Sequence, residues 1–141
     1  MNNAGVIELG SIENTSMEQY DRVMNINIRS MYHLTMLAVP SLIETKGNIV
    51  NVSSVNGIRS VRRKDQLLRC FFFLTISFQF PGLLAYNVSK AAVDQFTRCV
   101  ALELAPKQVR CNCVNPGVTV TELQKRGGLS DEQYEKVKKA A

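Results

Sequence analysis

Apolar side chains recur at three- and four-residue spacing through the first third of the chain, which predicts an amphipathic helix. The recurring positions are Met24, Ile28, Met31, Leu34, Leu37 and Ala38. Ser16 and Gln19 form a capping-box pair, so the helix is expected to begin directly after Ser16. Because proline lacks the amide hydrogen that a helix interior uses, Pro40 is expected to end or kink this helix.

The rest of the chain alternates between short apolar runs and one long helical stretch. Residues 48–54 and 109–114 are runs typical of buried parallel strands, and residues 84–104 continue without a helix breaker up to Pro106. A turn-forming segment, residues 2–5, begins the chain. This order of elements predicts an α/β fold with a parallel sheet and right-handed crossovers. A length of 141 residues indicates one domain, or part of one.

The net charge does not indicate a nucleic-acid partner. Lys and Arg total 17 against 12 Asp and Glu, a formal charge of +5. Residues 61–79 carry +3 of this charge and residues 125–141 carry +2, so the remainder is neutral. A phosphate-binding surface needs basic residues clustered on one face, which this distribution lacks. Residues 125–141 are expected to form a basic tail that is helical or frayed.

Cysteine usage and hydropathy favour a reducing compartment without membrane contact. The four cysteines lack the C-x-x-C spacing of zinc sites and the density of small secreted domains. The longest apolar stretch, residues 70–80, is too short for a membrane span, which needs about 20 residues. No basic region followed by an apolar run comes after Met1, as a secretory signal would require. We therefore expect a cytoplasmic protein, with a mitochondrial or other organelle left open.

Tyr86 and Lys90 are a candidate acid/base pair. They are four residues apart in the predicted helix over 84–104, so their side chains share one face. A tyrosine phenol has a pKa of about 10, and a nearby ammonium favours the phenolate and lowers that pKa. Taken alone, this spacing also fits a solvated surface pair.

The surrounding motifs favour the acid/base interpretation of Tyr86 and Lys90 over a solvated surface pair. Ser54 ends a predicted strand, where α/β sheets place ligands, and Asn27 lies in the preceding helix. Alone, Ser54 would be a strand-end hydroxyl bonded to backbone and Asn27 a helix amide packed against a loop. The motifs that occur in order are Asn2-Asn3-Ala4-Gly5, Met24-Asn25-Ile26-Asn27, Val52-Ser53-Ser54, Tyr86 with Ser89, Lys90 and Ala91, and Asn115-Pro116-Gly117 with Thr121. Together they resemble the short-chain dehydrogenase/reductase family, close to its 3-oxoacyl-(acyl-carrier-protein) reductase-like members.

The resemblance implies NAD or NADP as cofactor and a small-molecule carbonyl or alcohol as substrate. Tyr86 would be the general acid/base, and Lys90 would lower the pKa of Tyr86 and hold the nicotinamide ribose. Ser54 would hydrogen-bond the substrate oxygen, and Asn27 would hold a water in a proton relay behind Lys90. The cofactor contacts that the resemblance implies fall on Asn3, Ala4, Gly5, Tyr86, Lys90, Pro116, Gly117, Val118 and Thr121.

The resemblance covers only part of the family fold. The chain corresponds to strands 4–6 of a Rossmann-like, doubly wound parallel sheet with their helices, without the N-terminal βαβ units and their Gly-rich phosphate turn. It also stops before the last strand and most of the segment that covers the substrate. We therefore expect residues 1–141 to form a single partial dinucleotide-binding-type domain, inactive or nearly so as written.

Residues 61–79 are interpreted as a foreign insertion. Ser54 and Tyr86 lie 32 positions apart, and without these 19 residues they would lie 13 apart. The block holds four of the six phenylalanines. Val61 to Lys64 can be encoded by a sequence resembling a 5′ splice site, Phe71 to Phe73 by a pyrimidine tract and Gln79 by CAG, which suggests a retained intron. The alternative is a real loop that forms a lid or touches a membrane.

Two functions follow from these observations. The first is hydride transfer between NAD(P) and a carbonyl or alcohol, with Tyr86 as general acid/base. The alternative is a non-catalytic truncated or mis-spliced product that docks on intact family subunits. In the family, the helices corresponding to residues 17–44 and 84–105 form the homo-oligomer interface. A Ser-His hydrolase fits less well, since the chain has no G-x-S-x-G elbow and its one histidine, His33, is expected to be an ordinary helix residue.

Overall fold

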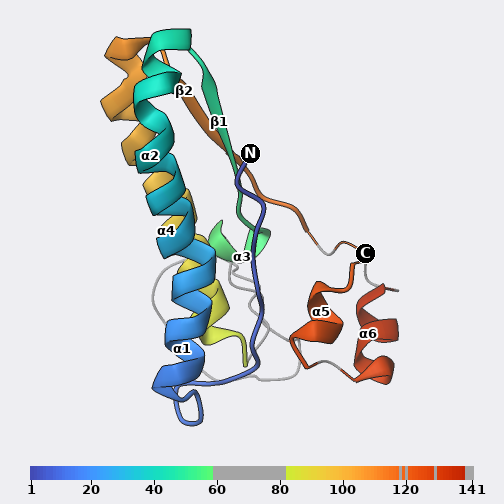
Figure 1. The fold of residues 1–141 in the computed structure, drawn as a ribbon. Helices are drawn as coiled ribbons and strands as arrows, with labels where there is room; N and C mark the ends of the chain where they lie inside the picture. The colour runs from blue at the N-terminus through green and yellow to red at the C-terminus, as the bar shows by residue number, and fades with distance from the viewer. Residues whose placement is uncertain (59–81, 118, 120, 129, 139–141) are drawn as a thin grey trace, which may run out of the picture.

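The computed structural model describes residues 1–58, 82–117, 119, 121–128 and 130–138. The predicted insertion, residues 61–79, and the candidate residue Val118 lie outside the described residues. Along the chain the elements are α1 (Met17–Met24), η1 (Asn25–Arg29), α2 (Ser30–Thr45), β1 (Asn48–Val52), α3 (Val55–Ile58), α4 (Leu84–Leu104), η2 (Ala105–Lys107), β2 (Arg110–Val114), α5 (Leu123–Arg126) and α6 (Asp131–Lys138). Figure 1 shows the α1–η1–α2 and α4 helices on one side of the two strands.

Strands β1 and β2 form a parallel pair, so the predicted α/β class with a parallel sheet is confirmed. The register runs from Asn48 opposite Arg110 to Val52 opposite Val114. Asn2 adds an isolated parallel bridge to Asn51, with backbone bonds of 2.9 Å on either side of that residue. Helix α4 connects the two strands, as a crossover between parallel strands requires.

The first helical segment begins where the capping box predicts. The Ser16 side chain accepts a hydrogen bond from the Gln19 backbone, and the Gln19 side chain accepts one from the Ser16 backbone. Of the two outcomes expected at Pro40, an end of the helix is wrong, because α2 continues to Thr45, and a kink stays a prediction. Pro40 deprives only the Met36 carbonyl of a helical donor, and Met36 is 55% exposed, so water can replace that donor.

A π-helical turn, η1, interrupts the first helical segment, which apolar spacing did not predict. It carries Asn27, the one buried residue of that turn. Single π-turns inside α-helices are frequently found at functional sites. Helix periodicity alone therefore does not determine where the Asn27 side chain lies.

Helix α4 carries the broadest buried face among the described elements. Its fully buried Val93 packs in the core, together with Val23 of α1 and Val109 just before β2. A polar line crosses this core: the Asn2 amide donates to Asn51 Oδ1 at 2.8 Å, and the Asn51 amide donates to Thr97 Oγ1 at 2.9 Å. Each buried polar group on that line has a partner, as burial requires.

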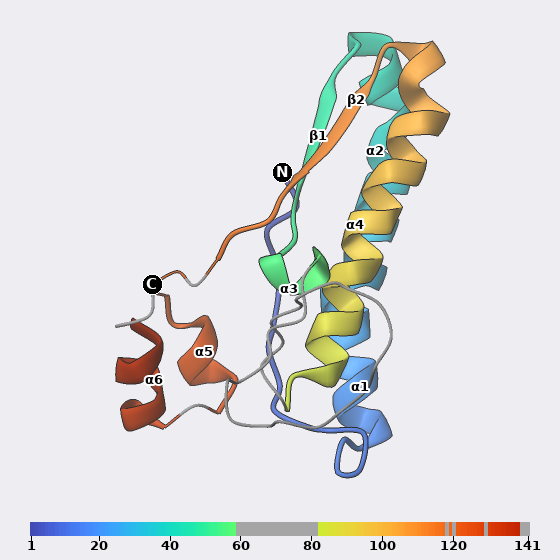
Figure 2. The ribbon, with the colours of Figure 1, turned by 180° about the vertical axis from the view of Figure 1, so that it is seen from behind.

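Helices α4 and α2 run alongside one another when seen from either side (Figures 1 and 2). The C-terminal helices α5 and α6 lie apart from them, next to the N-terminal segment. A Cβ added at Gly127 would come within 3.0 Å of Ile7, so the end of α5 packs closely on that segment. No helix within the described ranges is long and apolar enough to cross a membrane.

Candidate functional site

Three predicted side chains meet at the carboxyl end of β1. Ser54 is the second residue after β1, and Tyr86 and Lys90 occupy the first two turns of α4. Their exposed fractions are 8%, 6% and 5%. The Ser54 side chain lies close enough to the Tyr86 phenol to act against the rise of its pKa. The structure therefore brings together a hydroxyl, a phenol and an ammonium in a largely buried site, despite their separation along the chain.

The Lys90 ammonium is held between the strand end and the tyrosine ring. Its Nζ donates to the Val52 carbonyl oxygen at 2.9 Å and lies 5.7 Å from the centre of the Tyr86 ring. Burial lowers the pKa of Lys90 from its ordinary value, and the charge of Asp94 acts in the opposite direction. The ammonium is thus fixed near Tyr86 by a backbone hydrogen bond.

The Tyr86 phenol is neutral at physiological pH. Burial raises its pKa above the ordinary value of 10.0, and the hydrogen bond from Ser54 only partly offsets this. Burial therefore dominates the pKa of Tyr86 in the chain without ligands, and the lowering expected from Lys90 stays a prediction. A neutral phenol can donate a proton to a bound carbonyl oxygen, which is the acid half of acid/base chemistry.

The Asn27 side chain is fully engaged by protein groups. Its Oδ1 accepts from the Val6 backbone N–H at 2.8 Å, and its Nδ2 donates to the Val6 carbonyl at 3.0 Å. The same Nδ2 donates to Ser89 Oγ at 2.9 Å, and that hydroxyl donates to the Tyr86 carbonyl at 2.7 Å. Asn27 thus joins the N-terminal segment to the first turn of α4. Its side chain acts as a structural link, and the relay role expected for Asn27 remains a prediction.

Gly5 separates Asn27 from Lys90. A Cβ added at Gly5 would lie 3.5 Å from Asn27 Oδ1 and 3.6 Å from Lys90 Nζ. Both are ordinary van der Waals distances, so the Gly5 backbone lies directly beside the ammonium. Asn3 and Ala4 are exposed and line a hollow of about 130 Å³ with Asn27. The segment expected to contact a cofactor therefore does border the site.

The segment after β2 is only partly brought to the site. The Pro116 carbonyl accepts a hydrogen bond from the Val55 backbone at 3.0 Å, which places Pro116 next to the residue after Ser54. Gly117 continues this segment, and its carbonyl accepts from the Thr119 hydroxyl at 3.3 Å. Thr121 instead bonds to Gln124 at 3.0 Å, and its carbonyl accepts from the Tyr134 hydroxyl at 3.0 Å.

The structure adds residues that the motif analysis did not single out. Asp94 is 4% exposed and accepts a 2.8 Å hydrogen bond from Asn115 Nδ2, which also donates to the Ser54 carbonyl at 3.0 Å. The Ser53 hydroxyl donates to the Lys90 carbonyl at 3.1 Å. One signal was available for Asp94, because it follows Lys90 by four residues on the same face of α4.

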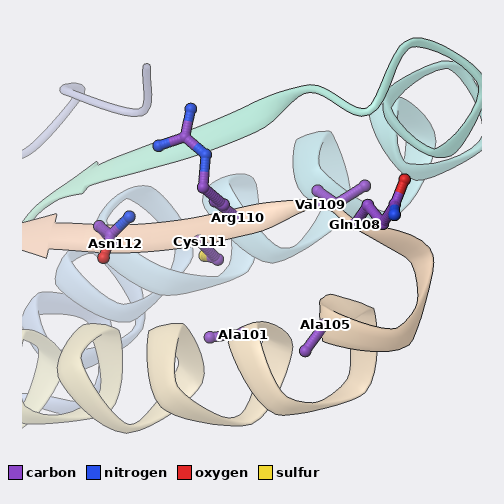
Figure 3. A pocket seen from close by; sticks show the side chains of 7 residues that line it. All are labelled: Ala101, Ala105, Gln108, Val109, Arg110, Cys111 and Asn112. Atoms are coloured by element: carbon purple, nitrogen blue, oxygen red, sulfur yellow. The ribbon is translucent and has the colours of Figure 1, made fainter.

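The larger hollow of the described residues lies elsewhere. It has a volume of about 560 Å³ between the end of α4 and the start of β2 (Figure 3), where Ala101 and Ala105 leave space beside Cys111. Ala101 is 15 residues after Tyr86 on α4, or about 22 Å along a helix. This hollow is therefore separate from the Ser54–Tyr86–Lys90 site.

Comparisons with known families agree with the order of the motifs. The family model described as "short chain dehydrogenase" matches residues 1–64. The model described as "Enoyl-(Acyl carrier protein) reductase" matches residues 73–141. Residues 65–72, which neither match includes, fall inside the predicted insertion at 61–79.

Curated relatives match over most of this chain. Cyclopentanol dehydrogenase of Comamonas testosteroni is 36% identical over 124 residues, which cover 87% of this chain and 42% of that protein. Carbonyl reductase (NADPH) 2 of Sus scrofa is 31% identical over 140 residues, covering 98% of this chain and 50% of that protein. The chain thus spans about half the length of the curated relatives it matches.

Solved structures share the fold. The 3-ketoacyl-(acyl-carrier-protein) reductase from Brucella melitensis, complexed with NADH, superposes with a TM-score of 0.71 and 27% identity. The similarity covers 89% of this chain and 46% of that one. The family matches on both sides of residues 65–72, together with the Ser54, Tyr86 and Lys90 site, show that the chain belongs to the short-chain dehydrogenase/reductase family.

Proposed function

We propose that this chain carries the proton-transfer site of an NAD(P)-dependent oxidoreductase acting on a small carbonyl or alcohol. The observation that carries the proposal is the burial of Tyr86 beside Ser54 and the Lys90 ammonium. The relatives named above are dehydrogenases and reductases, and two of them carry NADPH or NADH in their names. Those names support the chemistry that the geometry allows.

The described residues fit the nicotinamide-ribose part of such a cofactor. The Gly5 backbone lies beside Lys90 Nζ, whose ammonium can donate to ribose hydroxyls. When bound, the nicotinamide supplies the hydride that the protein side chains cannot. Asn3, Ala4, Gly5, Pro116 and Gly117 would border it. Identification of NAD or NADP as the preferred form is part of the test below.

The role of each side chain follows from its protonation state. In the reducing direction, the neutral Tyr86 phenol donates its proton to the carbonyl oxygen as hydride reaches the carbonyl carbon, which yields the alcohol. The Ser54 hydroxyl hydrogen-bonds the same oxygen, and the Lys90 ammonium stabilises the phenolate that remains. In the oxidising direction the phenolate removes the proton from the alcohol. The Tyr86 and Ser54 side chains already lie beside one another in the chain without ligands.

The test is carbonyl-dependent oxidation of NADH and NADPH by the purified chain, with a panel of small ketones and aldehydes. We expect Tyr86→Phe to abolish the reaction, because phenylalanine cannot donate the proton. Tyr32→Phe is the matched control, since Tyr32 is 56% exposed and lies on α2 away from the site. Because the chain is expected to be inactive or nearly so as written, its rate should be low. A rate above background that Tyr86→Phe does not reduce would contradict the proposal.

A specific observation favours a second candidate function, docking onto an intact family subunit. Helix α2 exposes Tyr32, Leu34, Met36 and Leu37 at 55–62%, and α4 exposes Leu102 at 77%. Clustered exposed apolar side chains mark interaction surfaces. Co-purification of the chain with an intact relative, weakened by Leu34→Glu with Leu37→Glu, would support docking. A chain that never elutes with the relative would count against it.

A further inference from the structure

Beneath the candidate site, α4 buries a carboxylate that the proposed chemistry does not use. Asp94 is 4% exposed. Its Oδ1 accepts from Asn115 Nδ2 at 2.8 Å and from Cys113 Sγ at 3.4 Å. Its Oδ2 is buried with no hydrogen-bond partner. Burying an unpartnered carboxylate oxygen costs free energy, so a role for the charge itself is expected.

The position of Asp94 depends on a glycine in the neighbouring helix. A Cβ added at Gly57 of α3 would collide with Asp94 Oδ2 and would lie 2.8 Å from the Lys90 carbonyl oxygen. The carboxylate therefore fills the space that Gly57 leaves open between α3 and α4. This close approach fixes the carboxylate in one place, one helical turn beyond Lys90.

Asp94 reaches the candidate site through one amide group. Asn115 Nδ2 carries two hydrogens, and it donates one bond to Asp94 Oδ1 and another, of 3.0 Å, to the Ser54 carbonyl. The carboxylate thus orients the amide that fixes the backbone of Ser54. A carboxylate is the stronger acceptor for such an amide, because charge-assisted hydrogen bonds are shorter and stronger than neutral ones.

The charged groups that face Asp94 come from two of the elements around it. Lys90 lies on α4 itself, and the Cys113 thiol faces it from β2. Arg98, one turn further along α4, acts on Cys113. From α3 the close neighbour is Gly57, which carries no charge. The Asp94 charge raises the pKa of Lys90 against the lowering effect of burial, so it favours the ammonium form.

We propose that Asp94 is a positioning residue of the Ser54–Tyr86–Lys90 site: it orients Asn115 to hold the Ser54 carbonyl, and its negative charge stabilises the Lys90 ammonium one helical turn away. The proposal rests on the proposed function for the roles of Ser54 and Lys90. Asp94 itself touches neither substrate nor cofactor in this arrangement. It acts on Asn115 through a hydrogen bond and on Lys90 through its charge.

Two substitutions separate the hydrogen bond from the charge. Asp94→Asn keeps an oxygen that can accept from Asn115 but removes the charge, and Asp94→Ala removes both. Nuclear magnetic resonance of the purified chain reports each effect, through the titration of the Lys90 Cε signal and through hydrogen exchange of the Asn115 side-chain amide. Asp131→Asn is the matched control, because Asp131 pairs with Lys125 on the surface and is 93% exposed.

In both Asp94 variants we expect the pKa of Lys90 to fall below its value in the unsubstituted chain. Exchange of the Asn115 amide should rise about tenfold in Asp94→Ala, the equivalent of one hydrogen bond, and should be rescued in Asp94→Asn. Asp131→Asn should change neither signal. An unchanged Lys90 titration in Asp94→Asn, or unchanged Asn115 exchange in Asp94→Ala, would overturn the proposal.

One measurement on the unsubstituted chain keeps the proposal testable should the Asp94 variants not fold. The Asn115 amide should exchange about tenfold more slowly than that of Asn112, which is exposed on β2, three residues earlier. Equal exchange of the two amides would overturn the proposal. None of these measurements uses cofactor or turnover, so failure of the proposed oxidoreductase function and failure of this inference are distinguishable.

Discussion

Replacing Asn27 by alanine tests how far one buried amide joins the two halves of the site. Asn27 is 2% exposed. Its side chain bonds to the Val6 N–H at 2.8 Å, to the Val6 carbonyl at 3.0 Å and to Ser89 Oγ at 2.9 Å. Alanine removes all three bonds while leaving helix propensity intact or improved. The perturbation therefore acts on hydrogen bonding and packing rather than on the helix itself.

The magnitude follows from the groups left without partners. A buried donor or acceptor that loses its partner costs about 1–3 kcal/mol. Two backbone groups of Val6 are affected, and Val6 is only half-buried, so water compensates in part. Ser89 keeps its bond to the Tyr86 carbonyl. We expect Asn27→Ala to lower the free energy of unfolding by about 2–4 kcal/mol, a large share of the 5–15 kcal/mol typical of a domain.

Urea unfolding followed by far-ultraviolet circular dichroism measures this loss. Asn112→Ala is the control, because Asn112 is exposed, and it should change the free energy of unfolding by less than about 0.5 kcal/mol. Asn27→Asp keeps an acceptor for the Val6 N–H but turns a carboxylate oxygen toward the Val6 carbonyl, so it should cost at least as much as alanine. Asn27→Ala within about 0.5 kcal/mol of the unsubstituted chain would refute the reasoning.

Three further outcomes are expected. Gly57→Ala should lower the free energy of unfolding in urea by about 1–3 kcal/mol, because the new methyl group collides with the fixed Asp94 carboxylate; an unchanged midpoint would contradict that packing. Burial raises the pKa of Tyr86, so the stabilising contribution of the neutral phenol is full below the ordinary value of 10.0 and is lost as pH rises through the folded-state pKa. Above that pH, urea titrations should show the chain losing stability relative to Tyr86→Phe. Parallel pH profiles of the two proteins would contradict the raised pKa. Exposed Cys99 should react with a thiol reagent more than about tenfold faster than buried Cys111, whose pKa is raised by burial, as mass spectrometry of labelled peptides would measure; equal labelling would contradict the burial.

Local patterns predicted the regular elements well. The capping box located the start of α1, apolar runs located β1 and β2, and Pro106 marked the end of α4. These succeeded because each depends on a few neighbouring residues. The expected end of the helix at Pro40 failed because an exposed carbonyl tolerates the loss of one helical donor. The apolar spacing did not predict the π-turn at Asn27, because that turn is accompanied by contacts with Val6 and Ser89, which are distant from it in sequence.

For the site, too, local patterns predicted some features and the tertiary structure decided others. The motif order was enough to identify the family and to select Ser54, Tyr86 and Lys90, because residue types at fixed spacing on one helix or at a strand end are local information. The direction of the Tyr86 pKa and the clamp from Asp94 through Asn115 to Ser54 depended on the tertiary structure. Both are set by burial and by contacts between segments distant in sequence, and no local pattern records how much water reaches a phenol or which amide meets a carboxylate.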